Sequence, residues 1–104
     1  METAFRISHT SALILQTIHS GHVYGFNIME ITGLPSGTIY PALRRLEKDS
    51  FIRGGWEDKK NALAQERPAR RYYKLTRQGK EALAYAMDRY PLLARLAAEE
   101  IVRR

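Results

Sequence analysis

The sequence of 104 residues contains no cysteine, which excludes disulfide bridges, zinc–thiolate sites and thiol chemistry. It has no apolar run long enough to span a membrane, and its first residues lack the basic-then-apolar order of a secretory signal. A chain of this length forms one domain with a modest core. We therefore expect a cytoplasmic protein with no membrane contact.

Residue sets typical of enzymes are also missing. The sequence has no Ser-His-Asp arrangement, no glycine-rich phosphate loop and no clustered pair of carboxylates. His19 and His22 are spaced to share a metal ion, but no third ligand accompanies them. We expect no enzyme activity, no metal and no cofactor.

Acidic residues are scarce in the middle of the chain. Residues 38–80 hold twelve Lys or Arg against five acids, a net charge of +7, whereas residues 1–37 sum to −1 and residues 81–104 to 0. The whole excess of +6 therefore lies in one block. A basic block on a small domain indicates an anionic partner.

Two short helices and a turn lead into this block. Capping residues at 8–11 precede an apolar run that Ser20-Gly21-His22 ends, and a second helix is predicted from about 24 to 31. Residues 32–37 form a turn by their Gly and Pro content. A third helix follows from about 38 to 49, which completes a helix-turn-helix.

The third helix has two different faces. One face is apolar and is expected to enter the core: Ile39, Ala42, Leu43 and Leu46. The opposite face holds no carboxylate: Thr38, Tyr40, Pro41, Arg44, Arg45 and Lys48. Pro41 is expected in the first turn, where its missing N–H costs little. Such a helix suits the major groove of DNA, and the alternative is a solvated helix that happens to be basic.

A β-hairpin is predicted after the helix-turn-helix. Residues 51–57 and 70–76 have the composition of strands, and Gly54-Gly55 weakens the first strand or marks a bulge. The polar and basic segment 58–69 between them is expected to be the hairpin tip. A basic hairpin in this place is the wing of a winged helix.

The last segment reads as a helix that packs on another helix. Thr76 is a suitable N-cap, and Pro91 is expected to kink or break the helix near Tyr90. We therefore predict a mainly α fold with a small β-hairpin. Residues 1–76 form a winged helix-turn-helix DNA-binding domain, with the wing at about 51–76, and residues 77–104 form a C-terminal dimerisation helix.

Three segments carry a family resemblance. Tyr24-Gly25-Phe26-Asn27-Ile28, the run from Gly37 to Glu47, and Arg71-Tyr72-Tyr73-Lys74-Leu75-Thr76 resemble the PadR family of bacterial transcriptional regulators, in its order and spacing, over about residues 8–85. The resemblance implies a homodimer that binds an operator in double-stranded DNA, usually as a repressor. It implies a dimer interface made by the first and last helices. Some members release DNA when a small aromatic molecule binds.

Site residues follow from these patterns. The expected DNA-binding residues are Tyr24, Ser36, Thr38, Tyr40, Arg44, Arg45, Lys59, Lys60, Arg67, Arg70 and Arg71. The expected dimerisation residues are Leu15, Leu83, Met87, Tyr90, Leu93, Leu96, Ala97 and Ile101. An effector pocket between the two C-terminal helices would involve Tyr85, Met87 and Tyr90. Some small members of the family bind flat ligands between tryptophans of the dimer helix, and this chain departs from that pattern because it has no tryptophan there.

Several alternatives stay open at this stage. The sequence leaves undecided which of Thr38, Tyr40, Arg44 and Arg45 reads a base and which holds a phosphate. A protein-interaction module with a winged-helix shape and a DNA-organising protein without sequence preference are the two competing functions.

Overall fold

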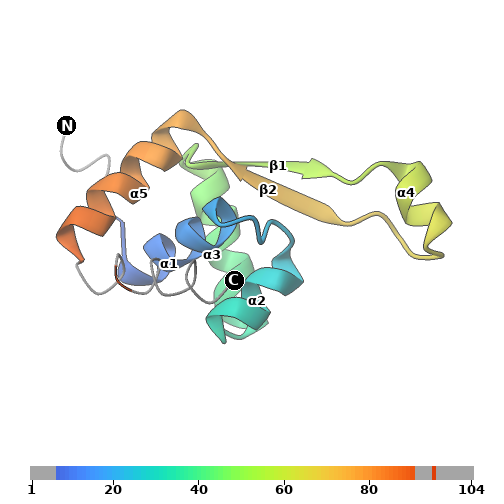
Figure 1. Cartoon of the computed structure of the whole chain (residues 1–104), viewed down its shortest axis with the longest axis horizontal. Coiled ribbons are helices and arrows are strands. Elements are labelled where there is room, and N and C mark those ends of the chain that lie inside the picture. Colours follow the sequence, from blue (N-terminus) through green and yellow to red (C-terminus); the bar gives the residue numbers. More distant parts are fainter. Residues whose placement is uncertain (1–6, 91–94, 96–104) are drawn as a thin grey trace.

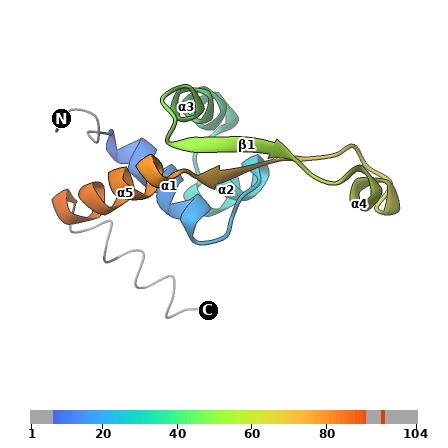
Figure 2. The same ribbon diagram turned by 90° about the horizontal axis from the view of Figure 1, so that it is seen from above.

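A helical body and a projecting hairpin make up the computed structural model, which describes residues 7–90 and Arg95. The elements in chain order are α1 (His9–His19), α2 (Gly25–Thr32), α3 (Ser36–Lys48), β1 (Ile52–Trp56), α4 (Lys59–Ala64), β2 (Arg71–Leu75) and α5 (Arg77–Arg89). The β1–β2 hairpin extends away from the body and has α4 at its far end (Figure 1). Seen from above, α3 lies on one side of the hairpin and α1 and α5 lie on the other (Figure 2). The fold is mainly helical with a small antiparallel hairpin, as the sequence predicts.

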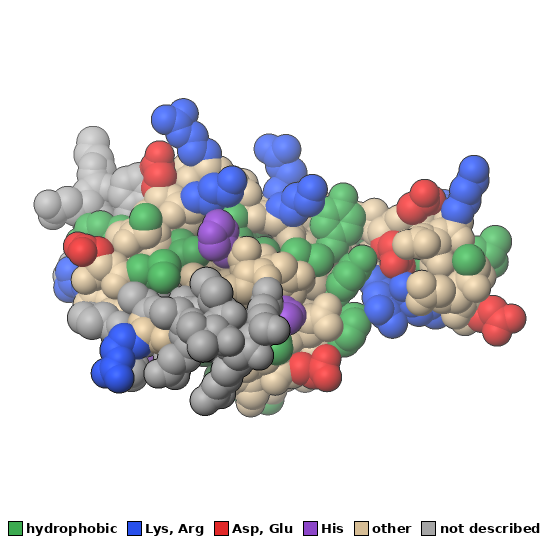
Figure 3. Space-filling view, in the orientation of Figure 1, with side chains coloured by type: hydrophobic (Ala, Val, Ile, Leu, Met, Phe, Trp, Pro, Cys, Tyr) green, Lys and Arg blue, Asp and Glu red, His purple; other side chains and the backbone are tan. Residues whose placement is uncertain are grey.

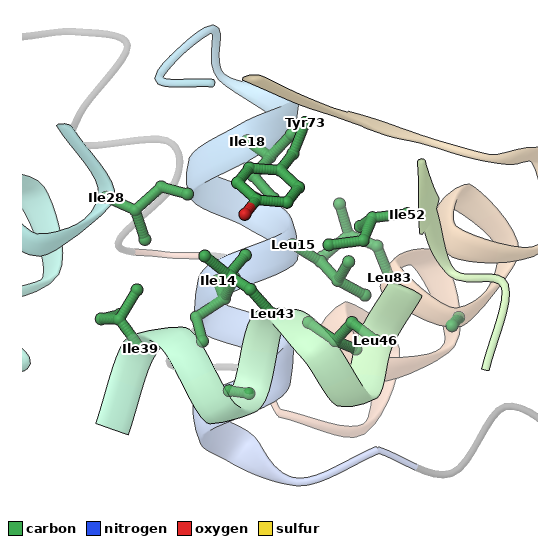
Figure 4. Packing of buried hydrophobic residues seen from close by; sticks show 12 residues of the cluster. Ile14, Leu15, Ile18, Ile28, Ile39, Leu43, Leu46, Ile52, Tyr73 and Leu83 are labelled. Carbon is green, nitrogen blue, oxygen red and sulfur yellow. The ribbon is translucent and has the colours of Figure 1, made fainter. Parts of the chain in front are cut away.

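The core forms where α1 meets α3, α5 and the base of the hairpin (Figure 4). All four residues predicted on the inner face of α3 are buried. The remaining buried members of the cluster are Ile14, Leu15, Ile18, Ile28, Ile52, Tyr73, Ala82 and Leu83. Each fully buried Ile or Leu contributes about 1.5–3 kcal/mol relative to an exposed one. This core fixes the position of α3 and leaves its other face in solvent.

The ends of the first two helices match the sequence signals. Ser8 caps α1, since its hydroxyl accepts a hydrogen bond from the Ser11 N–H at 3.0 Å. Gly33 ends α2 in the left-handed region at φ 73°, which glycine adopts without steric cost. The helix-turn-helix is therefore confirmed, although Ile31 at the end of α2 is 48% exposed and does not enter the core.

Helix α3 begins earlier than predicted, and this changes the place of Pro41. The helix starts at Ser36, so Pro41 is its sixth residue and lies beyond the first turn. The expectation of a first-turn proline is wrong. Pro41 lacks the N–H that would bond the carbonyl of Gly37, four residues earlier.

The hairpin is a regular ladder without a bulge. Its register runs from Ile52 opposite Leu75 to Trp56 opposite Arg71. Gly54 and Gly55 have another role: a Cβ on either would collide with a side chain of β2, that of Arg71 or Tyr72 respectively. The bulge considered for Gly54-Gly55 is therefore absent from this pair of strands.

The hairpin tip contains a short helix where the sequence predicts a loop. The Asp58 carboxylate accepts a hydrogen bond from the Lys60 N–H at 3.0 Å and caps α4. Ala62 on this helix is 3% exposed. A capping residue followed by good helix formers favours a short helix here. The polar composition of residues 58–69 suggested a loop instead.

Helix α5 begins and ends where predicted. The Thr76 hydroxyl accepts from the Gly79 N–H at 3.0 Å, and the helix ends at Arg89, before Pro91. A Cβ on Gly79 would collide with the carbonyl oxygen of Phe51, so α5 packs on the hairpin base through a bare backbone. None of the helices in the described part is long and apolar enough to cross a membrane.

Two predicted dimer contacts lie in the core. Leu15 is 0% and Leu83 is 4% exposed within the single chain, so both pack in its core, and their contribution to a dimer interface stays a prediction. A periodic apolar stripe shows that a face is buried but does not show by what. Leu93, Leu96, Ala97 and Ile101 lie outside the described residues.

Candidate nucleic-acid interface

The outer face of α3 carries the predicted groove-facing residues. Thr38, Arg44 and Arg45 are exposed, and Tyr40 is 38% exposed. The two arginines make no ion pair with any residue in the described part of the chain. Two long cations and short polar groups therefore project from a rigid helix without an acid to neutralise them. Ser36 is also exposed, but it is the first residue of α3 and not its cap, a position held by Pro35.

Tyr40 is positioned by a glycine in the next helix. Its ring and hydroxyl lie so close to Gly25 that a Cβ there would be 2.8 Å from Oη. The ring of Tyr40 therefore reaches from α3 to the first residue of α2. This contact explains physically why a glycine follows Tyr24.

Tyr40 forms one wall of a small hollow. The hollow measures about 170 Å³ and lies between the start of α2, the outer face of α3 and strand β2. Its lining is aromatic and basic: Tyr24, Gly25, Phe26, Tyr40, Arg70, Arg71 and Tyr73. Four predicted DNA-binding side chains meet here from three separate parts of the sequence: Tyr24, Tyr40, Arg70 and Arg71.

Arg70 is held against aromatic rings at the mouth of this hollow. Its guanidinium carbon lies 4.5 Å from the ring centre of Phe26 and 5.9 Å from that of Tyr24. These two rings stack on each other with centroids 6.0 Å apart. Cation–π contacts of this kind orient an arginine while leaving its N–H donors available. Phe26, 39% exposed, is a site residue that the sequence analysis missed.

Arg71 joins α3 to the hairpin. Its Nη2 donates to Glu47 Oε2 at 2.8 Å, and its guanidinium lies over the rings of Trp56 at 5.3 Å and Tyr73 at 5.9 Å. The Arg71 side chain passes over Gly54, which has no Cβ to block it. Burial raises the pKa of the neighbouring Tyr73 hydroxyl above its ordinary value, so the ring stays neutral. Arg71 thus has a structural partner, which sequence analysis did not identify.

Arg67 also has a partner within the chain. Its Nη1 and Nη2 donate to the two carboxylate oxygens of Glu57 at 2.6 and 2.8 Å. The Arg70 N–H donates to the same carboxylate at 3.3 Å. The hydrogen bond from Arg67 lowers the pKa of Glu57 below its ordinary value. This arrangement closes the chain at the point where the hairpin ladder ends.

The remaining predicted contacts lie on the hairpin tip. Lys59 and Lys60 are exposed on α4, and neither forms an ion pair with another described residue. Figure 3 shows basic side chains in separate groups over α5, over the hairpin and at its tip. The tip also carries acidic side chains, those of Glu57, Asp58 and Glu66, so Lys59 and Lys60 are two local cations separated from α3 by the length of the hairpin (Figures 1 and 3).

The predicted effector residues lie partly against α1. The ring of Tyr90 meets that of His9 with centroids 5.1 Å apart, and its hydroxyl donates to the Ile7 carbonyl at 3.4 Å. Met87 packs with Tyr90 beside Ala12 and Ala86. Tyr85, 36% exposed, lies on the outer side of α5.

Known proteins resemble the chain in fold and sequence. It is similar to the structure of a PadR family transcription regulator from hypervirulent Clostridium difficile R20291, with a TM-score of 0.71, 22% identity and coverage of 90% of this chain and 99% of the other. A Streptococcus transcriptional regulator has a TM-score of 0.66 and 24% identity, with 91% and 92% of the two chains covered. A PadR-like regulator from Bacillus cereus strain ATCC 14579 has a TM-score of 0.65 and 24% identity, with 88% and 90% covered.

The comparison with curated proteins gave no match. A family model, described as the transcriptional regulator PadR-like family, matches residues 14–85, which span the helix-turn-helix, the whole hairpin and most of α5. Members of this family are transcription regulators with a winged helix-turn-helix. The chain belongs to the transcriptional regulator PadR-like family.

Proposed function

We propose that this protein is a sequence-specific regulator that binds double-stranded DNA as a homodimer and represses transcription. The observation that carries the proposal is the outer face of α3, where Thr38, Tyr40, Arg44 and Arg45 are exposed and no carboxylate opposes the two arginines. An α-helix fits the major groove of B-DNA, and guanidinium groups bind guanine O6 and N7 in a bidentate manner. The function requires the compartment that holds the DNA, the cytoplasm.

A phosphate of the DNA backbone is the proposed occupant of the hollow beside Tyr40. Its walls offer the hydroxyls of Tyr24 and Tyr40 and the oriented guanidinium of Arg70. Phosphate contacts of this kind fix a helix in its register on the duplex before any base is read. Helix α2 would then lie across the backbone while α3 enters the groove.

The hairpin supplies a second contact with the same duplex. Lys59 and Lys60 at the tip are the proposed phosphate ligands, because both are exposed and unpaired within the described residues. Arg67 and Arg71 contribute charge, but their guanidinium groups are engaged by Glu57 and Glu47. Their main role in the proposal is to hold the hairpin in shape.

Dimerisation is assigned to the segment 77–104. Met87 and Tyr90 lie at the end of α5 against α1, and the apolar stripe of the sequence continues through Leu93, Leu96, Ala97 and Ile101. Two copies would place two α3 helices on half-sites about 34–36 Å apart on a two-fold symmetric operator. A small aromatic effector near Tyr85, Met87 and Tyr90 would act by changing this spacing.

Selection of DNA from a random duplex pool tests the proposal. The expected result is a two-fold symmetric consensus, bound with an affinity that falls steeply as salt is raised. The double substitution Arg44→Ala, Arg45→Ala should abolish selective binding while circular dichroism shows an intact fold. Absence of binding at low salt would favour a protein-interaction module. Equal affinity for consensus and random duplexes would favour a DNA-organising protein.

The oligomeric state is tested separately. Sedimentation equilibrium at micromolar concentration should give the mass of a dimer. A stable monomer at that concentration contradicts the dimer proposal without affecting the assignment of α3.

A further inference from the structure

Trp56 is an exposed tryptophan that the proposed function does not yet use. It is the only tryptophan of the chain, and 64% of its surface is exposed. Tryptophan is on average one of the more buried residues, since its indole gains much free energy by leaving water. An indole left in solvent at the end of a regular strand calls for a functional explanation.

Trp56 lies on the α3 side of the hairpin. Side chains of β1 alternate between two faces, so Trp56 shares its face with Ile52, which is 2% exposed and packs in the core with α3 residues. Arg71 confirms the placement, because its guanidinium contacts both Trp56 and Glu47 of α3. The indole therefore projects beside the recognition helix, beyond the edge of the helical body.

The indole is also held in place. The Arg71 guanidinium lies 5.3 Å from its ring centre and is itself fixed by the 2.8 Å bond to Glu47. Gly54 has no side chain to block this path. A ring supported in this way loses little conformational freedom when it meets a partner, which favours binding.

We infer that Trp56 is a DNA-contacting residue whose indole packs against the deoxyribose wall of the minor groove next to the major groove occupied by α3. This inference rests on the proposed function. With α3 in the major groove, the α3 side of the hairpin faces the neighbouring minor groove. Deoxyribose offers an apolar surface to the ring, and the indole N–H can donate to an acceptor on the groove edge.

The charge around Trp56 supports a polyanionic partner over a protein surface. Arg71 lies opposite Trp56 on β2, Arg70 precedes it, and Lys59 and Lys60 lie three and four residues after Trp56. Of the two acids between Trp56 and Lys59, Glu57 is neutralised by its ion pair with Arg67. Apolar side chains that enter the minor groove between basic neighbours are a known mode of DNA contact.

The fluorescence of the single tryptophan tests the inference directly. The consensus duplex from the selection, labelled with fluorescein, is titrated into the full-length protein, and label anisotropy measures binding while acrylamide quenching of tryptophan emission measures access to Trp56. We expect the quenching constant to fall several-fold as the anisotropy saturates. Saturating anisotropy with an unchanged quenching constant would overturn the inference while leaving DNA binding intact.

Variants separate a contact from an indirect shielding of the ring. Trp56→Ala should weaken consensus binding by about tenfold, and Trp56→Phe should recover part of the loss. Leu63→Ala is the matched control, because Leu63 is a 78% exposed apolar residue on α4 at the far end of the same hairpin. Wild-type affinity of folded Trp56→Ala, or an equal loss in Leu63→Ala, would overturn the inference. If anisotropy shows no binding by the wild-type protein, the proposed function fails and the inference fails with it.

Discussion

Arg67 binds both carboxylate oxygens of Glu57, ten positions earlier in the wing, at 2.6 and 2.8 Å. The pair closes the segment that contains α4, and the Arg70 N–H adds a third hydrogen bond to the same carboxylate. The Glu57–Arg67 pair thus locks together the two ends of this segment, which form the neck of the wing. The lock depends on the charge of a single carboxylate, which makes it sensitive to pH.

The pH response of the wing follows from the lowered pKa of Glu57. A carboxyl whose folded-state pKa lies below its ordinary value of 4.5 stabilises the closed neck above that pH, and the stabilisation is lost as pH falls through the folded-state pKa. The protection of the α4 amides against hydrogen exchange, relative to their intrinsic exchange rates at each pH, should therefore fall below about pH 4.5. Glu57→Gln should show low protection already at neutral pH and no further fall on acidification. Identical pH profiles of the two proteins would contradict the lock.

Single alanine substitutions on α3 distinguish base contacts from phosphate contacts. If Arg44 reads a guanine, Arg44→Ala should cost about 1–3 kcal/mol of binding and relax the preference at one position of the site. If it holds a phosphate, binding should weaken equally for all sequences, and the salt slope should fall by about 1. Arg45→Ala is measured in the same way. A variant of either residue that binds as tightly and selectively as wild type removes that residue from the interface.

Gly25→Ala tests the position of Tyr40. The new methyl would lie 2.8 Å from Tyr40 Oη, and the ring end can move away, so the fold should survive while DNA affinity falls. Tyr40→Phe removes only the hydroxyl. If displacement of that hydroxyl is the cause, the double variant should lose no more affinity than the larger single loss. Fully additive losses would show that Gly25 acts through something other than Tyr40.

Gly79→Ala should destabilise the fold, in contrast to Gly25→Ala. The added Cβ would meet the Phe51 carbonyl oxygen, so two backbones must separate, with an expected loss of about 1–3 kcal/mol or more. Gly37→Ala is the control, because its Cβ would meet open space within α3, where alanine is favoured by up to about 1 kcal/mol. Urea unfolding measures both. Equal stability of the two variants would contradict the packing described for α5.

Glu47→Gln tests the support of Trp56 without DNA. Loss of the carboxylate charge should loosen Arg71, and the steady-state anisotropy of the single tryptophan should then decrease. Glu81→Gln is the control, because Glu81 pairs with Arg77 at 3.5 Å on exposed α5 and has no contact with the hairpin pair. An unchanged anisotropy in Glu47→Gln would show that Arg71 holds Trp56 by other means.

Local sequence signals predicted the elements that local chemistry determines. The apolar spacing of Ile39, Leu43 and Leu46 predicted the buried face of α3, and Thr76 predicted the start of α5. Both signals are contained within one or two helical turns. The helix-turn-helix and the hairpin could be placed for the same reason.

Features that depend on contacts between distant residues could not be predicted. The partners of Arg67 and Arg71 are ten and twenty-four positions away, and only the three-dimensional structure brings Glu57 and Glu47 to them. From the sequence alone, both arginines were predicted to contact DNA, with no partner within the chain. Leu15 is a related case, since its own chain already buries it.

The bond between Arg71 and Glu47 fixes how far the wing stands from α3. A duplex with one base pair inserted between the two proposed contact points would move the second point by about 3.4 Å and rotate it by about 34–36° around the axis. A hairpin clamped to its recognition helix by an ion pair and a continuous strand ladder has no hinge with which to follow that displacement. The affinity of the protein would therefore depend on the spacing between the two contact points within a half-site as well as on its base sequence.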